Sequence, residues 1–304
     1  MSRSSRRNRL LILKFLSLLS VVRGYNILVI VLAQYLAAVF ILSPDLQLNE
    51  VVFDPNLFFI VLASALAIAG GYIINGFYDR EKDWINRPLK TKLDHLVGQN
   101  KTLALYFSLN FLAVIVASYV SFRAVLFFSI YIFGIWFYSH KLKRIMFLGN
   151  LTSALLALTP FFAVFIYYQN FDTVIFVHAI FLFLILAARE VVKDLENIKG
   201  DLALNYKTIP VVVGADKAKY LITAVIALTV IPIYLLVAKY NTGYMEYYFY
   251  GSAILLMTFL LILWQSEARR EYVLLHNILK LVIVLGVFSI LLIDVDLVIK
   301  RFVF

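Results

Sequence analysis

An all-α, polytopic membrane protein is the fold class that the sequence predicts, and three observations predict it. Of the 304 residues, 63% are apolar and 15% are charged, whereas soluble domains have roughly 45–50% apolar and about 25% charged residues. Runs of about 20 residues almost free of charge recur along the chain, and each is long enough to cross a bilayer as a helix. Basic residues gather in alternate loops between these runs, as in cytoplasmic loops of membrane proteins.

Nine membrane-spanning helices are predicted from the apolar runs, with boundaries good to a few residues. They cover residues 25–42, 57–77, 102–120, 123–137, 147–168, 174–188, 218–238, 247–264 and 273–293. The fourth and sixth runs are short, so we expect their helices to extend into the polar flanks. We expect a single transmembrane domain over residues 1–304.

The loops orient the predicted helices. Lys and Arg follow the second, fourth, sixth and eighth spans, whereas loops 43–56 and 168–173 carry none. The positive-inside rule therefore places the N-terminus in the cytoplasm and, after nine spans, the C-terminus outside. Residues 1–22 are expected to be a cytoplasmic basic segment, with an interfacial helix over 10–22. Arg269 and Arg270, after the eighth span, are interpreted as part of this topology signal.

The composition narrows the possible functions. The net charge of +10 could indicate a nucleic-acid partner, but the bases lie in short loops between apolar runs, and we expect no nucleic acid. The absence of cysteine excludes disulfides and thiol chemistry. The four histidines form no His-x-x-x-His pair, so no zinc site is expected. His95 and His140 on the cytoplasmic side are interpreted as ordinary loop histidines.

A charged stretch follows the second predicted span. Asn75, Asp79 and Asp83 are spaced i, i+4 and i+8, so a continuous helix would place their oxygens on one face, one turn apart. Mg²⁺ takes oxygen ligands, commonly one or two carboxylates together with substrate phosphates. The alternative is a solvated helix end stabilised by i, i+4 charge pairs. The triplet alone does not decide between them.

A second acidic stretch closes the sixth span. Asp194, Asn197 and Asp201 are three and four residues apart, again on one side of a helix, and lie on the same predicted membrane face. Two acidic clusters on one face would repel each other unless cations lie between them. Mg²⁺ bridging a diphosphate, with Lys and Arg neutralising the remaining phosphate charge, meets this need. Two separately solvated loops are the alternative.

Taken together, these stretches resemble the UbiA superfamily of intramembrane prenyltransferases. The motif N-x-x-x-D-x-x-x-D at 75–83 is similar to its first aspartate-rich motif, and K-D-x-E-N-x-x-G-D at 193–201 to its second. The segment Y-S-x-x-L-K-R at 138–144 resembles the one between spans four and five, and R-G-Y-N at 23–26 resembles the opening of the first span. The matches run in family order from residue 23 to residue 214.

Three positions depart from the family pattern. Gly76 and Gly24 stand where Asp and Pro are common, and Asn197 stands where Asp is usual. An amide oxygen can ligate Mg²⁺ but contributes no charge, so Asp194 and Asp201 gain importance.

The resemblance implies nine helices around a central cavity, with cytoplasmic cap loops and a side opening to lipid. It implies Mg²⁺-dependent transfer of a prenyl group from a polyprenyl diphosphate, catalysed with Asp79, Asp83, Asp194, Asp201 and Tyr138. The implied metal ligands are Asn75, Asp79, Asp83, Asp194, Asn197 and Asp201. The implied substrate-binding residues are Arg23, Asn26, Lys143, Arg144, Lys193 and Lys207. The bases also have an alternative role at the membrane interface, and Tyr138 could stabilise an allylic cation or belong to an aromatic belt.

The second motif is nearest to enzymes that prenylate geranylgeranylglyceryl phosphate, a phosphate-bearing acceptor suited to the basic loops. Prenyltransferases acting on 4-hydroxybenzoate, dihydroxynaphthoate or homogentisate are the alternative. A non-catalytic protein that binds or transports cations or prenyl lipids also stays open, because acidic residues near a membrane can mark an ion path. The expected location is a prokaryotic inner membrane, among membrane lipids.

Overall fold

The computed structural model describes residues 17, 19–94, 98–296, 298 and 299. Over these residues the chain is helical, and nine helices are long and apolar enough to cross a membrane, which confirms the predicted fold class. The expected interfacial helix over 10–22 lies mostly outside the described residues, as does His95. The spans are Gly24–Leu42, Pro55–Tyr78, Gln99–Ser118, Phe122–Arg144, Leu148–Tyr168, Thr173–Ala203, Ala215–Ala238, Gly243–Gln265 and Arg269–Leu292.

The described chain divides into two compact units. The first contains the described residues up to Val31 and Phe59–Lys141, and the second contains Leu32–Phe58 and the described residues from Leu142 onward. Two of the boundaries fall within helices α2 (Gly24–Ala37) and α4 (Pro55–Tyr78), so each of these helices contributes to both units, and the third lies between Lys141 and Leu142. The expectation of a single domain over 1–304 stays a prediction.

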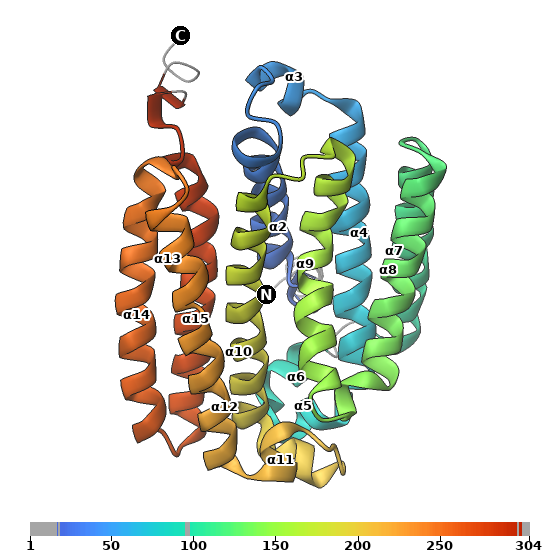
Figure 1. Ribbon diagram of the computed structural model, residues 1–304. Helices are drawn as coiled ribbons and strands as arrows, with labels where there is room; N and C mark the ends of the chain where they lie inside the picture. Colours follow the sequence, from blue (N-terminus) through green and yellow to red (C-terminus); the bar gives the residue numbers. More distant parts are fainter. Residues whose placement is uncertain (1–16, 18, 95–97, 297, 300–304) are drawn as a thin grey trace, which may run out of the picture. The chain divides into compact units, whose positions relative to one another are not determined.

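The first unit is built on α4 from Phe59 onward and on a helical hairpin. Its further helices are α5 (Arg80–Asn86), α6 (Pro88–Asp94), α7 (Gln99–Ser118) and α8 (Phe122–His140) (Figure 1). The hairpin turns at Ser121, whose hydroxyl accepts the N–H of Ala124 at 3.1 Å and so caps α8. Ile73, Ile74 and Tyr106 form a buried apolar cluster where α4 meets α7.

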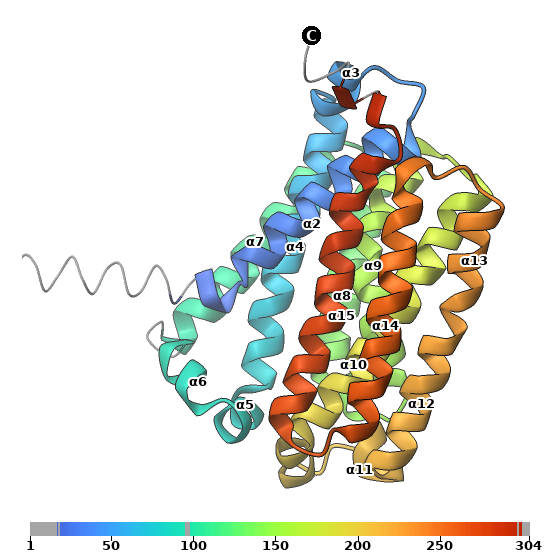
Figure 2. The ribbon, with the colours of Figure 1, turned by 90° about the vertical axis from the view of Figure 1, so that its left-hand side faces the viewer.

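The second unit is organised around one long helix. Its helices are α3 (Leu48–Val52), α9 (Leu148–Tyr168), α10 (Thr173–Ala203), α11 (Ile209–Val213), α12 (Ala215–Leu228), α13 (Val230–Ala238), α14 (Glu246–Gln265) and α15 (Arg269–Ser289). Helix α10 packs against α9, α12 and α15, and α14 and α15 form a hairpin beside it (Figures 1 and 2).

Helix α10 is central because its apolar residues recur at helical spacing. Ile185, Ala188, Val192 and Leu195 are three or four residues apart and all are buried. Its 31 residues, at about 1.5 Å each, span roughly 46 Å, whereas the hydrocarbon core is about 30 Å thick. The helix therefore extends well beyond the predicted run 174–188, and its last turns carry the second motif.

Buried polar side chains join segments that the sequence separates widely. The amide of Gln34, in the last turn of α2, is buried and donates to the carbonyl of Pro160 at 2.8 Å. At the start of α4, Asp54 accepts the hydroxyl of Tyr167 at 2.7 Å. In a membrane such groups need protein partners because lipid offers none. These bonds attach the start of the second unit to α9.

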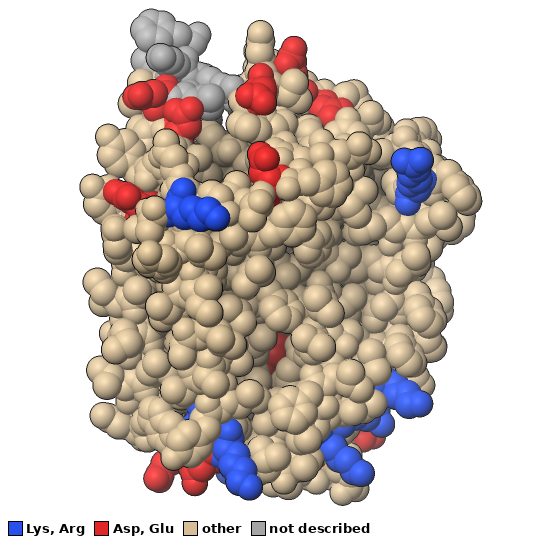
Figure 3. Space-filling model, viewed as in Figure 1, with Lys and Arg blue, Asp and Glu red and all other residues tan. Residues whose placement is uncertain are grey.

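The surface fits a membrane environment. In Figure 3, charged side chains gather near the two ends of the helices, and the band between them is nearly free of charge apart from one acidic patch. Large apolar side chains are exposed along the spans, for example Phe107, Phe111, Ile130, Ile254 and Leu261. An exposed apolar band of this kind favours contact with lipid. The protein is an integral membrane protein.

Gly70 on α4 leaves room for the side chain of Asn110 on α7. A Cβ atom built at this position would lie 2.7 Å from Oδ1 of Asn110. Membrane helices pack through small residues because these let backbones approach. We therefore expect Gly70→Ala to displace Asn110 and to destabilise the protein by about 1–3 kcal/mol, measured as a lower Tm in detergent. Gly251→Ala on α14 is the matched control, since its Cβ would meet nothing within 4 Å. Equal Tm values for both variants would contradict the packing argument.

Candidate functional site

The first oxygen face lies where α4 passes into α5. The backbone N–H of Asp79 donates to the carbonyl of Asn75 at 2.9 Å, and that of Asp83 to the carbonyl of Asp79 at 2.8 Å. These i→i−4 bonds continue the helical path across the turn at Asp79. The three side chains therefore project from one side, one turn apart, and all are half-buried. The structure confirms that the three residues share one side of a helical path. Their role as metal ligands stays a prediction.

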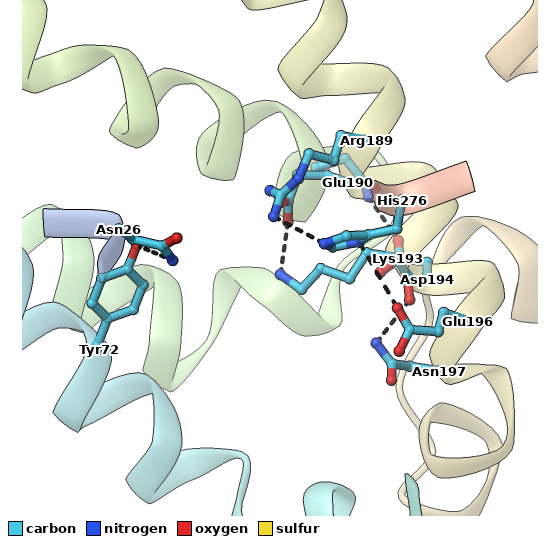
Figure 4. Close-up of polar contacts among 10 residues, drawn as sticks. Asn26, Tyr72, Arg189, Glu190, Lys193, Asp194, Glu196, Asn197 and His276 are labelled. Atoms are coloured by element: carbon cyan, nitrogen blue, oxygen red, sulfur yellow. Dashed lines mark hydrogen bonds and ion pairs between the residues drawn. The ribbon is translucent and has the colours of Figure 1, made fainter. Parts of the chain in front are cut away.

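Tyr72 extends this face inward along α4, three residues before Asn75. Its hydroxyl oxygen accepts a hydrogen bond from Nδ2 of Asn26 at 3.2 Å (Figure 4). The guanidinium carbon of Arg23 lies 5.1 Å from the centroid of its ring, a cation–π distance. Sequence reasoning missed Tyr72, although its spacing of three and seven residues from Asn75 and Asp79 was a usable signal. Tyr72 therefore contacts two predicted substrate-binding residues, Asn26 in α2 and Arg23 in the turn before it.

The second oxygen face lies on the last turns of α10. Asn150, near the start of α9, donates through Nδ2 to Oδ2 of Asp194 at 2.7 Å. The amide nitrogen of Asn197 donates to the carbonyl of Lys193, one turn earlier, at 2.8 Å. Because the amide nitrogen is bonded back to the helix, the amide oxygen of Asn197 points away from that carbonyl. This is the orientation that a metal ligand at Asn197 requires.

Asp201 completes this face and is fully buried. Its Oδ2 accepts the hydroxyl of Thr208 at 3.3 Å, and its backbone carbonyl accepts the N–H of Tyr206 at 2.9 Å. The chain between them turns through Asn205, which has a positive φ of 55°. The segment after α10 therefore folds back onto the carboxylate that ends the motif.

Glu190 lies one turn before Asp194 on the same face of α10. Its carboxylate is buried and forms ion pairs with Lys193 at 2.9 Å and with Arg189 at 3.3 Å (Figure 4). Sequence reasoning did not assign a role to Glu190, although positions 190, 194, 197 and 201 follow helical spacing. Lys193, which is predicted to bind phosphate, is thus paired with the carboxylate of Glu190.

The loop before α9 brings two predicted substrate-binding residues together. The backbone N–H of Lys207 donates to the carbonyl of Arg144 at 3.0 Å. The guanidinium carbon of Arg144 lies 4.9 Å from the ring centroid of Tyr206. The 3₁₀ turn Leu142–Arg144 can pack onto α9 because residue 149 is Gly, where a Cβ would lie 3.1–3.2 Å from the turn's backbone. The backbones of Arg144 and Lys207 are therefore hydrogen-bonded neighbours.

The predicted site residues fall into two groups, one in each unit. Tyr138 lies in the last turn of α8 in the first unit, and Lys143 lies in the 3₁₀ turn of the second; both are half-buried. The first unit holds Arg23, Asn26, Asn75, Asp79, Asp83 and Tyr138. The second holds Lys143, Arg144, Lys193, Asp194, Asn197, Asp201 and Lys207. Within each group the structure brings most members into contact or onto one helix face.

The donor sets suit Mg²⁺. Each face offers two carboxylates, Asp79 with Asp83 and Asp194 with Asp201, together with one amide oxygen. Among the described residues, no three His, Cys, Asp or Glu side chains converge as a ready-made metal cage. Mg²⁺ is usually held by one or two carboxylates and substrate phosphates rather than by such a cage. The amide oxygens, from Asn75 on the first face and Asn197 on the second, are oxygen donors without charge.

The fold and the site together define a class of protein. It is a polytopic helical membrane protein that carries two oxygen-rich helix faces with cationic side chains beside them. The sequence profile of the UbiA prenyltransferase family matches residues 31–282, and the chain belongs to this family. It is therefore an enzyme of the prenyltransferase class, and the resemblance inferred from the motifs is confirmed.

Named relatives are similar over most of the chain. The digeranylgeranylglyceryl phosphate synthase of Thermococcus gammatolerans is 33% identical over 258 residues, which cover 83% of this chain and 90% of that protein. The enzyme of the same name from Thermococcus kodakarensis is 30% identical over 221 residues, covering 71% of this chain and 79% of that one.

Solved structures share the fold. A structure of digeranylgeranylglyceryl phosphate synthase superposes with a TM-score of 0.68 at 18% identity, covering 91% of this chain and 97% of that one. A UbiA homologue from Archaeoglobus fulgidus bound to GPP and Mg²⁺ gives a TM-score of 0.66 at 16% identity, with coverages of 90% and 99%. The same homologue has also been solved with Cd²⁺, so divalent metals bind within this fold.

Proposed function

We propose that this protein transfers a geranylgeranyl group from its diphosphate to the free hydroxyl of geranylgeranylglyceryl phosphate. The observation that carries the reaction class is the first oxygen face, where three oxygen-bearing side chains stand one turn apart at the end of a spanning helix. The names of the relatives, one of them 33% identical over most of its length, support the choice of acceptor. The products are digeranylgeranylglyceryl phosphate and diphosphate.

The two faces share one task in this proposal. Asn75, Asp79 and Asp83 on one face, and Asp194, Asn197 and Asp201 on the other, hold Mg²⁺ on the diphosphate. When bound, the metal neutralises charge on the leaving group. Asn150 keeps the Asp194 carboxylate oriented, and Thr208 does the same for Asp201. Such preorganised groups lower the barrier because they need not rearrange as charge develops.

The bases and Tyr138 serve the reacting groups. Arg23, Lys143, Arg144, Lys193 and Lys207 bind phosphate oxygens of donor and acceptor, and Asn26 adds a polar contact. As the allylic C–O bond breaks, its electron pair leaves with the diphosphate, and Tyr138 faces the cationic carbon. The acceptor hydroxyl oxygen then bonds to this carbon and loses its proton to the released diphosphate. The apolar spans exclude water from the cation and receive the isoprenoid chains.

The proposed location is a prokaryotic cytoplasmic membrane with the N-terminus inside. This orientation puts the loops that follow the second and sixth spans, which carry the two acidic motifs, at the cytoplasmic side. The basic loops after the second, fourth, sixth and eighth spans support it.

The decisive assay supplies the purified protein in lipid with Mg²⁺ and geranylgeranyl diphosphate. Each reaction contains one acceptor: geranylgeranylglyceryl phosphate, 4-hydroxybenzoate, dihydroxynaphthoate or homogentisate. We expect the glyceryl phosphate acceptor to give product and diphosphate, and EDTA to stop the reaction. Transfer to an aromatic acceptor alone would replace the acceptor assignment. Failure to consume any prenyl diphosphate, short or long, would favour a non-catalytic binding or transport protein.

A further inference from the structure

A chain of polar contacts joins α10 to α15 beside the second oxygen face. Nη2 of Arg189 lies 3.0 Å from Nε2 of His276, and Nδ1 of His276 lies 3.8 Å from Oε2 of Glu196 (Figure 4). The other oxygen of Glu196 accepts Nη2 of Arg269 at 3.1 Å. Glu196 is buried, with a side chain 4% exposed, and His276 is 16% exposed. No step of the proposed reaction uses Arg189, Glu196 or His276.

The chemistry of arginine determines the state of His276. A guanidinium group carries only donors, so Nε2 of His276 must be the acceptor in this contact. The imidazole is therefore neutral, with its hydrogen on Nδ1, on the side of Glu196. A protonated imidazole would direct an N–H and a positive charge at Arg189 while strengthening its attraction to Glu196. The contact with Arg189 therefore requires the neutral form of the His276 ring.

Arg189 links His276 to the second oxygen face through Glu190. Its Nη1 lies 3.3 Å from the carboxylate of Glu190, which also holds Lys193 at 2.9 Å. Glu190 is one turn before Asp194 and is buried, so displacing Arg189 would leave its charge only partly compensated. Removing one partner of a buried charge network is costly, because the remaining charge stays desolvated.

We propose that His276 is a positioning residue of the prenyltransferase, acting as a neutral acceptor that holds Arg189 against Glu190. The proposal rests on the proposed function, since it names a further residue for the same site. His276 touches no reacting group in this scheme. By holding Arg189, it keeps the charge of Glu190 compensated beside Lys193, which binds the diphosphate in the proposed reaction.

The charged groups around the ring are few. Helix α10 presents Arg189 and Glu196 to it. Helix α15 itself carries Arg269, which pairs with Glu196, Arg270 and Glu271 beside it in the first turn, and Lys280, one turn beyond His276. Helix α14, which also packs on α15, has Glu246 as its single charged residue, at the end remote from the α14–α15 turn. Acidification therefore acts on the Arg189 contact chiefly by charging His276.

The test compares two substitutions across a pH series in the transfer assay. His276→Gln offers an amide oxygen as acceptor and does not titrate, and His276→Lys places a permanent charge beside Arg189. We expect wild-type kcat to fall on the acid side, where protonation of the ring removes its acceptor for Arg189. His276→Gln should keep at least about a third of the neutral-pH rate and lose this acid limb. His276→Lys should lose kcat about tenfold or more at every pH.

A second readout separates this inference from the proposed function. Mg²⁺ with inorganic diphosphate should raise the Tm of the wild type and of His276→Gln equally, and that of His276→Lys by less than half as much. His178→Gln is the control, because His178 lies on α10, has its Nδ1 2.8 Å from the carbonyl oxygen of Val174, and takes no part in the contacts among Arg189, His276 and Glu196. This control should retain the acid limb. A His276→Gln enzyme with an unchanged acid limb, or a His276→Lys protein with wild-type kcat and Tm shift, would overturn the proposal.

Discussion

Asp79→Asn is expected to reduce kcat by roughly 10²–10³-fold with little change in Tm. Asp79 is the middle of the three oxygen-bearing residues on the first face, and it is half-buried at the junction of α4 and α5. Asparagine keeps the size of the side chain and one oxygen but removes the negative charge. The loss of rate should therefore report charge at the metal and not a change of shape.

The control for this variant is Asp45→Asn. Asp45 is an exposed carboxylate in the loop between the first and second spans, outside both oxygen faces. We expect its kcat to stay within about twofold of wild type, since exposed surface changes away from special features are usually close to neutral. Raising Mg²⁺ should partly rescue Asp79→Asn if the defect is weak metal binding. Full activity of Asp79→Asn at low Mg²⁺ would remove Asp79 from the proposed ligand set.

Exchanging Asn150 and Asp194 is expected to separate a structural role from a catalytic one. Asp194→Asn alone removes a charge and should lower kcat by roughly 10²-fold or more. The double variant Asn150→Asp with Asp194→Asn restores an amide–carboxylate hydrogen bond between the same two positions, which are 2.7 Å apart at their polar atoms. It places the negative charge on α9 instead of α10.

Stability and activity should therefore respond differently to the exchange. The Tm lost in Asp194→Asn should return in the double variant, because a partly buried hydrogen bond is remade. The activity should stay low, because the carboxylate no longer belongs to the face formed with Asn197 and Asp201. If kcat recovers together with Tm, Asp194 has a structural role, and the second face must bind metal through other residues.

Sequence reasoning succeeded wherever the relevant neighbours lie close along the chain. The fourth and sixth runs were expected to continue into polar flanks, and α10 does so from Arg189 to its end at Ala203. The i, i+4, i+8 spacing of Asn75, Asp79 and Asp83 became one helix face because the backbone bonds continue through the junction. The topological interpretation of Arg269 was incomplete, because this side chain also pairs with buried Glu196.

The amino-acid sequence by itself determined the helical membrane class, the nine spans and the two sets of oxygen donors. These depend on the length of apolar runs and on 3.6 residues per turn, which are local properties. Only the tertiary structure decided that Asn150 supports Asp194, that Tyr72 holds Asn26, and that His276 meets Arg189. These partners are 44, 46 and 87 residues apart. Their contacts arise from the packing of whole helices, and no spacing rule along the chain encodes them.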